Sequence, residues 1–207
     1  MPGSAAPTGV TTATSAPAPI GLRVLRLVDR SRVAVFRDGR SGPRTLVTYV
    51  RYPRSGRGPF PLIVFGHGFA LLPGSYAKLL NAWTRAGFVV AAPVFPVENE
   101  HAPGGPDEND LSNQPGDMSF VISRLLASSA NPPSASYSLF RAVARPKYLL
   151  RLLGAGHLPP YTTAVRQLEV VERVTIAFLD RYLRAGSLDR LVAAGRAPGI
   201  ARLTSDP

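Results

Sequence analysis

The stretch PLIVFGHG, residues 61–68, decides the fold class of this chain of 207 residues. Its apolar residues run without a polar break and end at glycines, which is typical of a strand buried on both faces in a parallel sheet. A second run of this kind, FVVAAPVFP at 88–96, follows a predicted helix at 76–86 that Ser75 caps and Gly87 ends. Strand, helix and strand with short links predict an α/β architecture.

The N-terminal part of the chain predicts an antiparallel entry to this sheet. Strand-like stretches begin at Leu22, Arg32 and Thr45, and RDGRSG marks a turn between the second and the third. Residues 1–20 consist mostly of Ala, Pro, Ser, Thr and Gly and read as a disordered tail, which leaves 21–207 as a single domain. The tail lacks a basic segment and a continuous apolar run, so no signal peptide is predicted and a cytoplasmic location is favoured.

The C-terminal half continues the alternation. Helices are predicted at 117–130, at 134–144 and at 167–183, and KYLLRLL at 147–153 reads as a third buried strand. Two apolar faces support the helices at 117–130 and 167–183. They consist of Phe120, Ile122, Leu125 and Leu126 in the first and of Val170, Val174, Ala177 and Phe178 in the second. The sequence after Gly186 favours no single structure.

Composition excludes several classes of function. The formal net charge is +11, but the basic residues are scattered singly, and all but two of the 24 are arginines. A nucleic-acid interface would gather them on one face, so no nucleic-acid partner is expected. The chain has no cysteine, which excludes disulfides, thiolate metal sites and a cysteine nucleophile. No apolar run approaches the roughly 20 residues of a membrane span.

The segment FGHGFA, 65–70, is the first candidate site. Ligands bind outside the carboxyl ends of strands in such sheets, and glycines there expose backbone N–H groups. One such N–H can stabilise the oxyanion of an acyl-transfer intermediate, and we assign this role to Phe69. A plain glycine-rich turn between a strand and a helix explains the same residues equally well.

His157 is the second candidate. It lies in GAGHLPPY, 154–161, directly after the strand-like 147–153. An imidazole can act there as a general base, provided that it has a hydrogen-bonding partner. The alternative is a loop histidine that is hydrogen-bonded to the backbone.

A metal site is not expected. Asp107, Glu108, Asp110 and Asp117 offer oxygen ligands of the kind that calcium takes, but their spacing is not that of an EF-hand. These acids are better explained as a polar loop that caps the following helix. The spacing of the three histidines, 67, 101 and 157, matches no compact zinc motif. Neither a metal nor another cofactor is therefore predicted.

Four segments together give a family resemblance. GPFPLIVFGHGFA, GFVVAAPVFP, GGPDENDLSNQPGDMSFVISRLL and LLGAGHLPPYT resemble α/β-hydrolases of the dienelactone hydrolase, chlorophyllase and polyester hydrolase-like group, over about residues 22–205. The resemblance implies a mostly parallel sheet flanked by helices and hydrolysis of a small-molecule or polymeric ester by a Ser–Asp–His triad. It makes His157 the triad base and Phe69 the oxyanion residue, with Gly66, His67 and Gly68 in the pocket.

The sequence departs from the family's pattern at the nucleophile. G-x-S-x-G does not occur, and the chain passes from RLLASSA directly to NPPSASYSLF. The resemblance therefore implies an internal deletion near 128–133 that removes the nucleophile elbow and the acid-bearing strand, which leaves a truncated α/β-hydrolase fold. Ser75, Ser119 and Ser123 do not lie on a strand-to-helix turn, so none replaces the nucleophile.

Two functions remain open from the sequence. The first is an ester hydrolase-family protein that is catalytically incomplete in this chain. The second is a non-catalytic binding or interaction module that keeps half of the pocket: Gly66, His67, Phe69 and His157. The sequence leaves the oligomeric state open.

Overall fold

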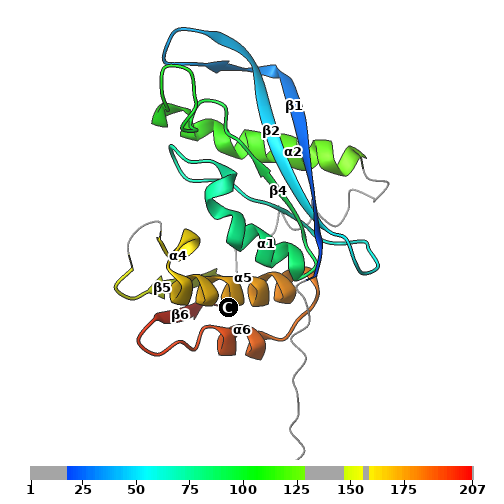
Figure 1. Ribbon diagram of the computed structural model, residues 1–207, viewed down its shortest axis with the longest axis vertical. Coiled ribbons are helices and arrows are strands. Elements are labelled where there is room, and N and C mark those ends of the chain that lie inside the picture. Colours follow the sequence, from blue (N-terminus) through cyan, green and yellow to red (C-terminus); the bar gives the residue numbers. More distant parts are fainter. Residues whose placement is uncertain (1–17, 129–146, 156–158, 207) are drawn as a thin grey trace, which may run out of the picture.

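The computed structural model describes residues 18–128, 147–155 and 159–206. Figure 1 shows a long hairpin at one end of the molecule and a layer of helices at the other. In chain order the elements are β1 (Ile20–Val35), β2 (Ser41–Pro53), β3 (Leu62–Val64), the 3-10 helix η1 (Pro73–Tyr76), α1 (Ala77–Arg85), β4 (Val89–Pro93), the 3-10 helix η2 (Glu108–Asn113), α2 (Gln114–Ser128), β5 (Lys147–Leu152), α4 (Pro159–Thr162), α5 (Val165–Leu183), α6 (Leu188–Ala194) and β6 (Ala201–Asp206).

Four strands form a mixed sheet in the order β1-β2-β4-β3. β1 pairs with β2 and β2 pairs with β4 antiparallel, whereas β3 and β4 pair parallel. β5 and β6 form a separate antiparallel sheet. The expectation of a mostly parallel sheet is therefore wrong. Within the four-stranded sheet, only β3 and β4 are joined through an α-helix, whereas β1 and β2 form a hairpin and are therefore antiparallel.

β1 is one strand where the sequence predicted two, at 22–29 and 32–38. Its register against β2 shifts between Asp29 and Val33. The Asp29 carboxylate accepts hydrogen bonds from the backbone N–H of Ser31 (2.9 Å) and from Nε of Arg32 (2.7 Å), and these bonds hold the bulge together. β1 also begins at Ile20, within the range that the sequence assigned to the tail.

α1 and α5 cover one face of the four-stranded sheet with apolar side chains. Leu80 and Trp83 of α1 meet Val90 of β4 and Leu168 of α5 in one buried cluster. The predicted helix at 76–86 is confirmed, and Gly87 ends it at φ +91°. Ser75 is not its cap, because it lies within η1 and α1 begins after Tyr76 with no side-chain cap.

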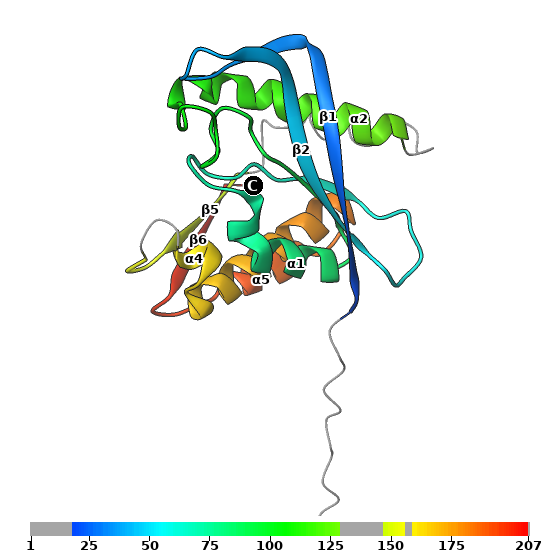
Figure 2. The ribbon, with the colours of Figure 1, turned by 45° about the horizontal axis from the view of Figure 1, so that its top comes forward.

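α2 covers the opposite face (Figure 2). Among its residues whose exposure is described, 114–126, the one fully buried apolar residue is Val121, which packs with Leu46, Ala91 and Phe95. The helix predicted at 117–130 is confirmed as far as Ser128, but its predicted apolar face omitted Val121.

α5 packs against both sheets. Its predicted face of Val170, Val174, Ala177 and Phe178 is confirmed and lies in a second apolar cluster with α6 and β6. The strand predicted at 147–153 exists as β5, but it is not a central strand of a parallel sheet, because it pairs antiparallel with β6. The helix predicted at 134–144 lies outside the described residues, as do residues 129–133 at the predicted deletion.

Candidate functional site

The turn that follows β3 holds most of the predicted site residues. Gly66 lies against the Phe95 ring, where an added Cβ would come within 3.3 Å of a ring carbon. Gly68 lies against Tyr76, and a Cβ there would be 2.8 Å from the Tyr76 hydroxyl. That hydroxyl accepts a hydrogen bond from the Gly68 N–H at 3.1 Å. Gly68 is therefore required for the turn to approach Tyr76 this closely.

His67 fastens the turn to the segment after β4. The side chain is buried, with 4% of the residue exposed. Its Nε2 accepts the backbone N–H of Phe95 at 3.0 Å, and its Nδ1 lies 2.9 Å from the carbonyl oxygen of Gly68. This pair of contacts requires a neutral ring that carries its proton on Nδ1. Burial lowers the pKa of His67 and favours the same neutral form. His67 thus holds the turn and is not open to a substrate.

Phe69 lies at the exposed crest of the turn, with 44% of the residue accessible to solvent. The backbone N–H groups on either side have acceptors, since Gly68 donates to Tyr76 and Ala70 donates to the carbonyl of Glu98 at 2.8 Å. The N–H of Phe69 has no acceptor within the described part of the chain. Ala70 adopts a left-handed conformation with φ +56°. The N–H of Phe69 is therefore a backbone donor at an exposed residue of the turn that is free to bind an anion.

A small hollow adjoins Phe69. Its volume is about 340 Å³, and Arg37 and residues 106–109 line the rest of it. The loop is held in place because Arg37 Nη1 donates to the carbonyl of Pro106 at 3.2 Å. Asp107 accepts the N–H of Asn109 at 3.0 Å and so begins η2. Phe69, whose N–H has no acceptor among the described residues, thus borders a polar recess and forms its aromatic wall.

No described side chains form the rest of a hydrolytic triad. His157 lies outside the described residues, so its predicted place near Phe69 stays a prediction. Ser119 and Ser123 use their hydroxyls to bond helix carbonyls of Pro115 and Ser119, at 2.8 and 2.9 Å. His101 is exposed and lies 3.8 Å from Glu100. Within the ranges described, no serine is hydrogen-bonded to a histidine.

A buried ion cluster joins β2 to the acidic loop, and sequence reasoning missed it. Arg44 is fully buried and binds Asp117 at 2.8 and 2.7 Å and Asp110 at 2.8 and 2.6 Å. Arg32 lies 2.9 Å from Asp117. Burial opposes the charge of Arg44, but its bonds to the two carboxylates outweigh burial and raise its pKa.

The cluster explains the acidic residues that suggested calcium. Asp110 and Asp117 are occupied by arginine, so they are not available as metal ligands. No group of three or more His, Asp or Glu side chains in the described ranges is arranged to hold a metal ion. The signal in the sequence was Arg44 itself, because alternation along β2 places it on the same face as Leu46 and Val50.

Glu98 connects this cluster to the turn. Its carbonyl accepts the Ala70 N–H, while its fully buried carboxyl accepts Nε2 of Gln114 at 2.5 Å. The second carboxyl oxygen has no partner among the described atoms. Burial raises the pKa of Glu98, and the nearby Asp110 and Asp117 act in the same direction. Glu98 is therefore hydrogen-bonded to the turn and lies within electrostatic reach of the ion cluster.

Comparisons with known proteins add little to this geometry. No protein-family model matches the chain, and no curated protein matches it. Among solved structures, the chain is similar to a ferulic acid esterase from Streptomyces cinnamoneus at 22% sequence identity, with a TM-score of 0.45. The match covers 59% of this chain and 50% of the esterase chain, so this chain spans about half of that structure's length. We build nothing on a likeness of this extent. In the described ranges, no helix is long and apolar enough to cross a membrane.

Proposed function

We propose that this chain is an ester hydrolase-type α/β protein that keeps the oxyanion side of a hydrolytic site and lacks the nucleophile side. The N–H of Phe69, which has no acceptor among the described residues and follows a partly buried strand that pairs parallel with β4, is the observation that carries the proposal. A donor in this place suits the negative oxygen of an acyl-transfer intermediate. His157 is proposed as the base and His67 as the residue that fixes the turn.

The proposed deletion is supported by two unpaired strand edges. The bonds from Val89 N–H to Pro61 O and from Phe65 N–H to Ala91 O direct odd-numbered residues of β3 toward β4. The backbone groups of Leu62 and Val64 therefore face away from β4, where no described strand pairs with them. β5 pairs only with β6 among the described strands. A family member with strands removed between β3 and β5 would have these two edges.

The proposal is tested by ester turnover together with active-site labelling. The purified chain and its His157→Ala variant are given p-nitrophenyl butyrate, and both are treated with a fluorophosphonate that labels activated serines. We expect the uncatalysed rate in both samples and no adduct by mass spectrometry. Turnover that His157→Ala abolishes, or an adduct on any serine, would show that the chain is a complete enzyme and would overturn the proposal.

The oxyanion donor has its own test. Butyrate carries a carboxylate that can accept from a free backbone N–H, so titration should shift the amide NMR signal of Phe69. The amide of Gly68 is the internal control, because it already donates to Tyr76. If the Phe69 signal stays in place while other amides shift, Phe69 is not the anion site and the oxyanion assignment fails.

The recess beside Phe69 favours a second candidate function, a non-catalytic binding module. Its aromatic wall and its polar loop form a small concave site without any described nucleophile. For this function, methyl butyrate should shift the amides of Phe69 and Asn109 in a saturable way and remain unhydrolysed. Hydrolysis of the bound ester would count against the module.

A further inference from the structure

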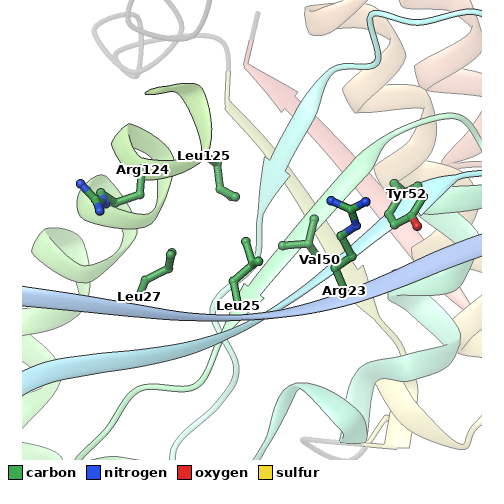
Figure 3. A pocket seen from close by; sticks show the side chains of 7 residues that line it. All are labelled: Arg23, Leu25, Leu27, Val50, Tyr52, Arg124 and Leu125. Atoms are coloured by element: carbon green, nitrogen blue, oxygen red, sulfur yellow. The ribbon is translucent and has the colours of Figure 1, made fainter. Parts of the chain in front are cut away.

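A second hollow shares no residue with the candidate site. It is a groove between the β1–β2 hairpin and α2, with a volume of about 750 Å³. Figure 3 shows the seven residues that line it. They are Arg23, Leu25, Leu27, Val50, Tyr52, Arg124 and Leu125. The volume lies within the range of small-molecule sites in proteins.

The floor of the groove is apolar. Leu25 and Leu27 rise from β1 on one face of the strand, as alternate residues do (Figure 3). Val50 adjoins them from β2, and Leu125 faces them from α2. Leu25 and Leu27 are partly buried against the cluster that contains Val50. The floor therefore has the shape and chemistry to bind a narrow hydrocarbon chain.

The charged residues that line the groove are both positive. Arg23 stands at one end beside Tyr52, and Arg124 belongs to the other end (Figure 3). No lining residue is acidic, and neither arginine has a carboxylate partner in the described ranges. Asp29, which follows Leu27 on the same face of β1, forms an ion pair with Arg32 at 2.7 Å. The groove is complementary to an anion that carries an apolar chain.

We propose that this groove binds one monomeric long-chain fatty carboxylate. The chain lies over Leu25, Leu27 and Val50, and the carboxylate accepts hydrogen bonds from the guanidinium of Arg23. Arg is suited to this role because its planar donors match the two oxygens of a carboxylate. Arg124 adds positive potential at the far end. The site is independent of the proposed hydrolytic function.

The test uses the full chain and cis-parinaric acid, a fluorescent fatty acid, below its micellar concentration. We expect saturable binding that dodecanoate displaces and that dodecyltrimethylammonium does not. Arg23→Gln should weaken binding about tenfold, because it removes a charge-assisted hydrogen bond. Arg124→Gln should weaken it by roughly two- to threefold, as for a distant screened charge.

Arg26→Gln is the matched control, because Arg26 lies on the opposite face of the same strand and is likewise exposed. It makes the same chemical change and should alter affinity less than about twofold. Circular dichroism confirms that the variants fold. His157→Ala should bind as the wild type does, so failure of the hydrolytic proposal would leave this one intact.

Three results would overturn the proposal. The first is equal loss of affinity in Arg23→Gln and Arg26→Gln, which would indicate attraction by net charge alone. The second is co-sedimentation with phosphatidylglycerol vesicles without any binding of monomeric fatty acid, which would make the groove a membrane contact. The third is a dimer in sedimentation that Leu27→Glu dissociates, which would show that a second copy covers the groove.

Discussion

The two faces of the four-stranded sheet are covered in different ways. On one face, α1 and α5 contribute a continuous set of buried apolar side chains, among them Leu80 and Trp83. On the other face, α2 contributes a single fully buried apolar residue, Val121, and places Asp117 against Arg44 instead. One layer is held by burial of apolar surface, and the other combines an apolar cluster with a buried ion cluster.

This difference determines how firmly each helix is positioned. Apolar packing has little directionality, so α1 and α5 are fixed by shape. The hydrogen bonds of Arg44 are directional, because its planar guanidinium binds one carboxylate from α2 and one from η2. The rotation of α2 and the path of the acidic loop are therefore set by one side chain of β2.

Loss of Arg44 should be the most damaging change to either face. Arg44→Met removes the buried cation of the cluster, so that Asp110 loses its arginine partner and Asp117 keeps only Arg32. Removal of one partner of a buried pair costs about 3–5 kcal/mol. We expect a decrease of that size in the free energy of unfolding, measured by urea denaturation.

Arg40→Met is the control for this change. Arg40 pairs with Asp38 at 2.7 Å, but its side chain is 70% exposed. An exposed pair contributes little to stability, because water and salt screen it. If Arg44→Met were as mild as Arg40→Met, the ion cluster would not hold α2, and the contrast between the faces would be wrong.

The apolar face should respond to a cavity. Leu80 is fully buried between α1 and the sheet, and Leu80→Ala should lower the free energy of unfolding by about 3 kcal/mol. Leu111→Ala is the matched control, because Leu111 is 52% exposed, and it should cost less than about 0.5 kcal/mol. Urea denaturation is again the measurement. Similar losses in the two variants would contradict the assignment of this face to apolar packing.

His67 should make the turn sensitive to acid. Because burial lowers its folded pKa, the unfolded chain takes up a proton as the pH falls below about 6.5, and the folded chain resists it. The contribution of His67 is therefore complete above that pH and decreases below it. His67→Gln should cost about 1 kcal/mol at pH 8, as for a lost hydrogen bond, and less at pH 5.

Thermal and urea unfolding at the two pH values measure this change. His101→Gln is the control at an exposed histidine, with a side chain that is 75% exposed, and it should leave stability unchanged at both values. A constant cost of His67→Gln between pH 8 and pH 5 would exclude His67 as the acid-sensitive contact.

Much of the helical structure was predictable from local patterns. The face of Val170, Val174, Ala177 and Phe178 predicted α5, and Gly87 marked the end of α1. These features depend on neighbours three or four residues away, which periodicity records. Apolar runs likewise located β3, β4 and β5, but the predicted burial on both faces is confirmed only for β4, since β3 and the described side chains of β5 are partly buried.

Pairing and long-range contacts were not predictable in the same way. KYLLRLL indicates a buried strand but not its partner, so the antiparallel pairing of β5 with β6 was missed. The contact of Arg44 with Asp117 joins residues 73 positions apart, and no local pattern encodes it. At the turn, the glycines that precede it suggested Phe69 as a candidate site residue. The role of His67 was not predictable, because it depends on the hydrogen bond that the distant Phe95 N–H donates to it.

The position of α5 has a mechanical consequence for the turn. Val170 and Val174 pack in the cluster with β6 and α6, while Leu168 and Val171 pack in the cluster that contains Tyr76. A rotation of α5 that repacks one cluster therefore repacks the other. Through this packing, α5 is coupled to Tyr76, whose hydroxyl accepts a hydrogen bond from the Gly68 N–H. A displacement of the β5–β6 sheet would therefore be expected to reach, through α5, the packing around Tyr76 beside the turn.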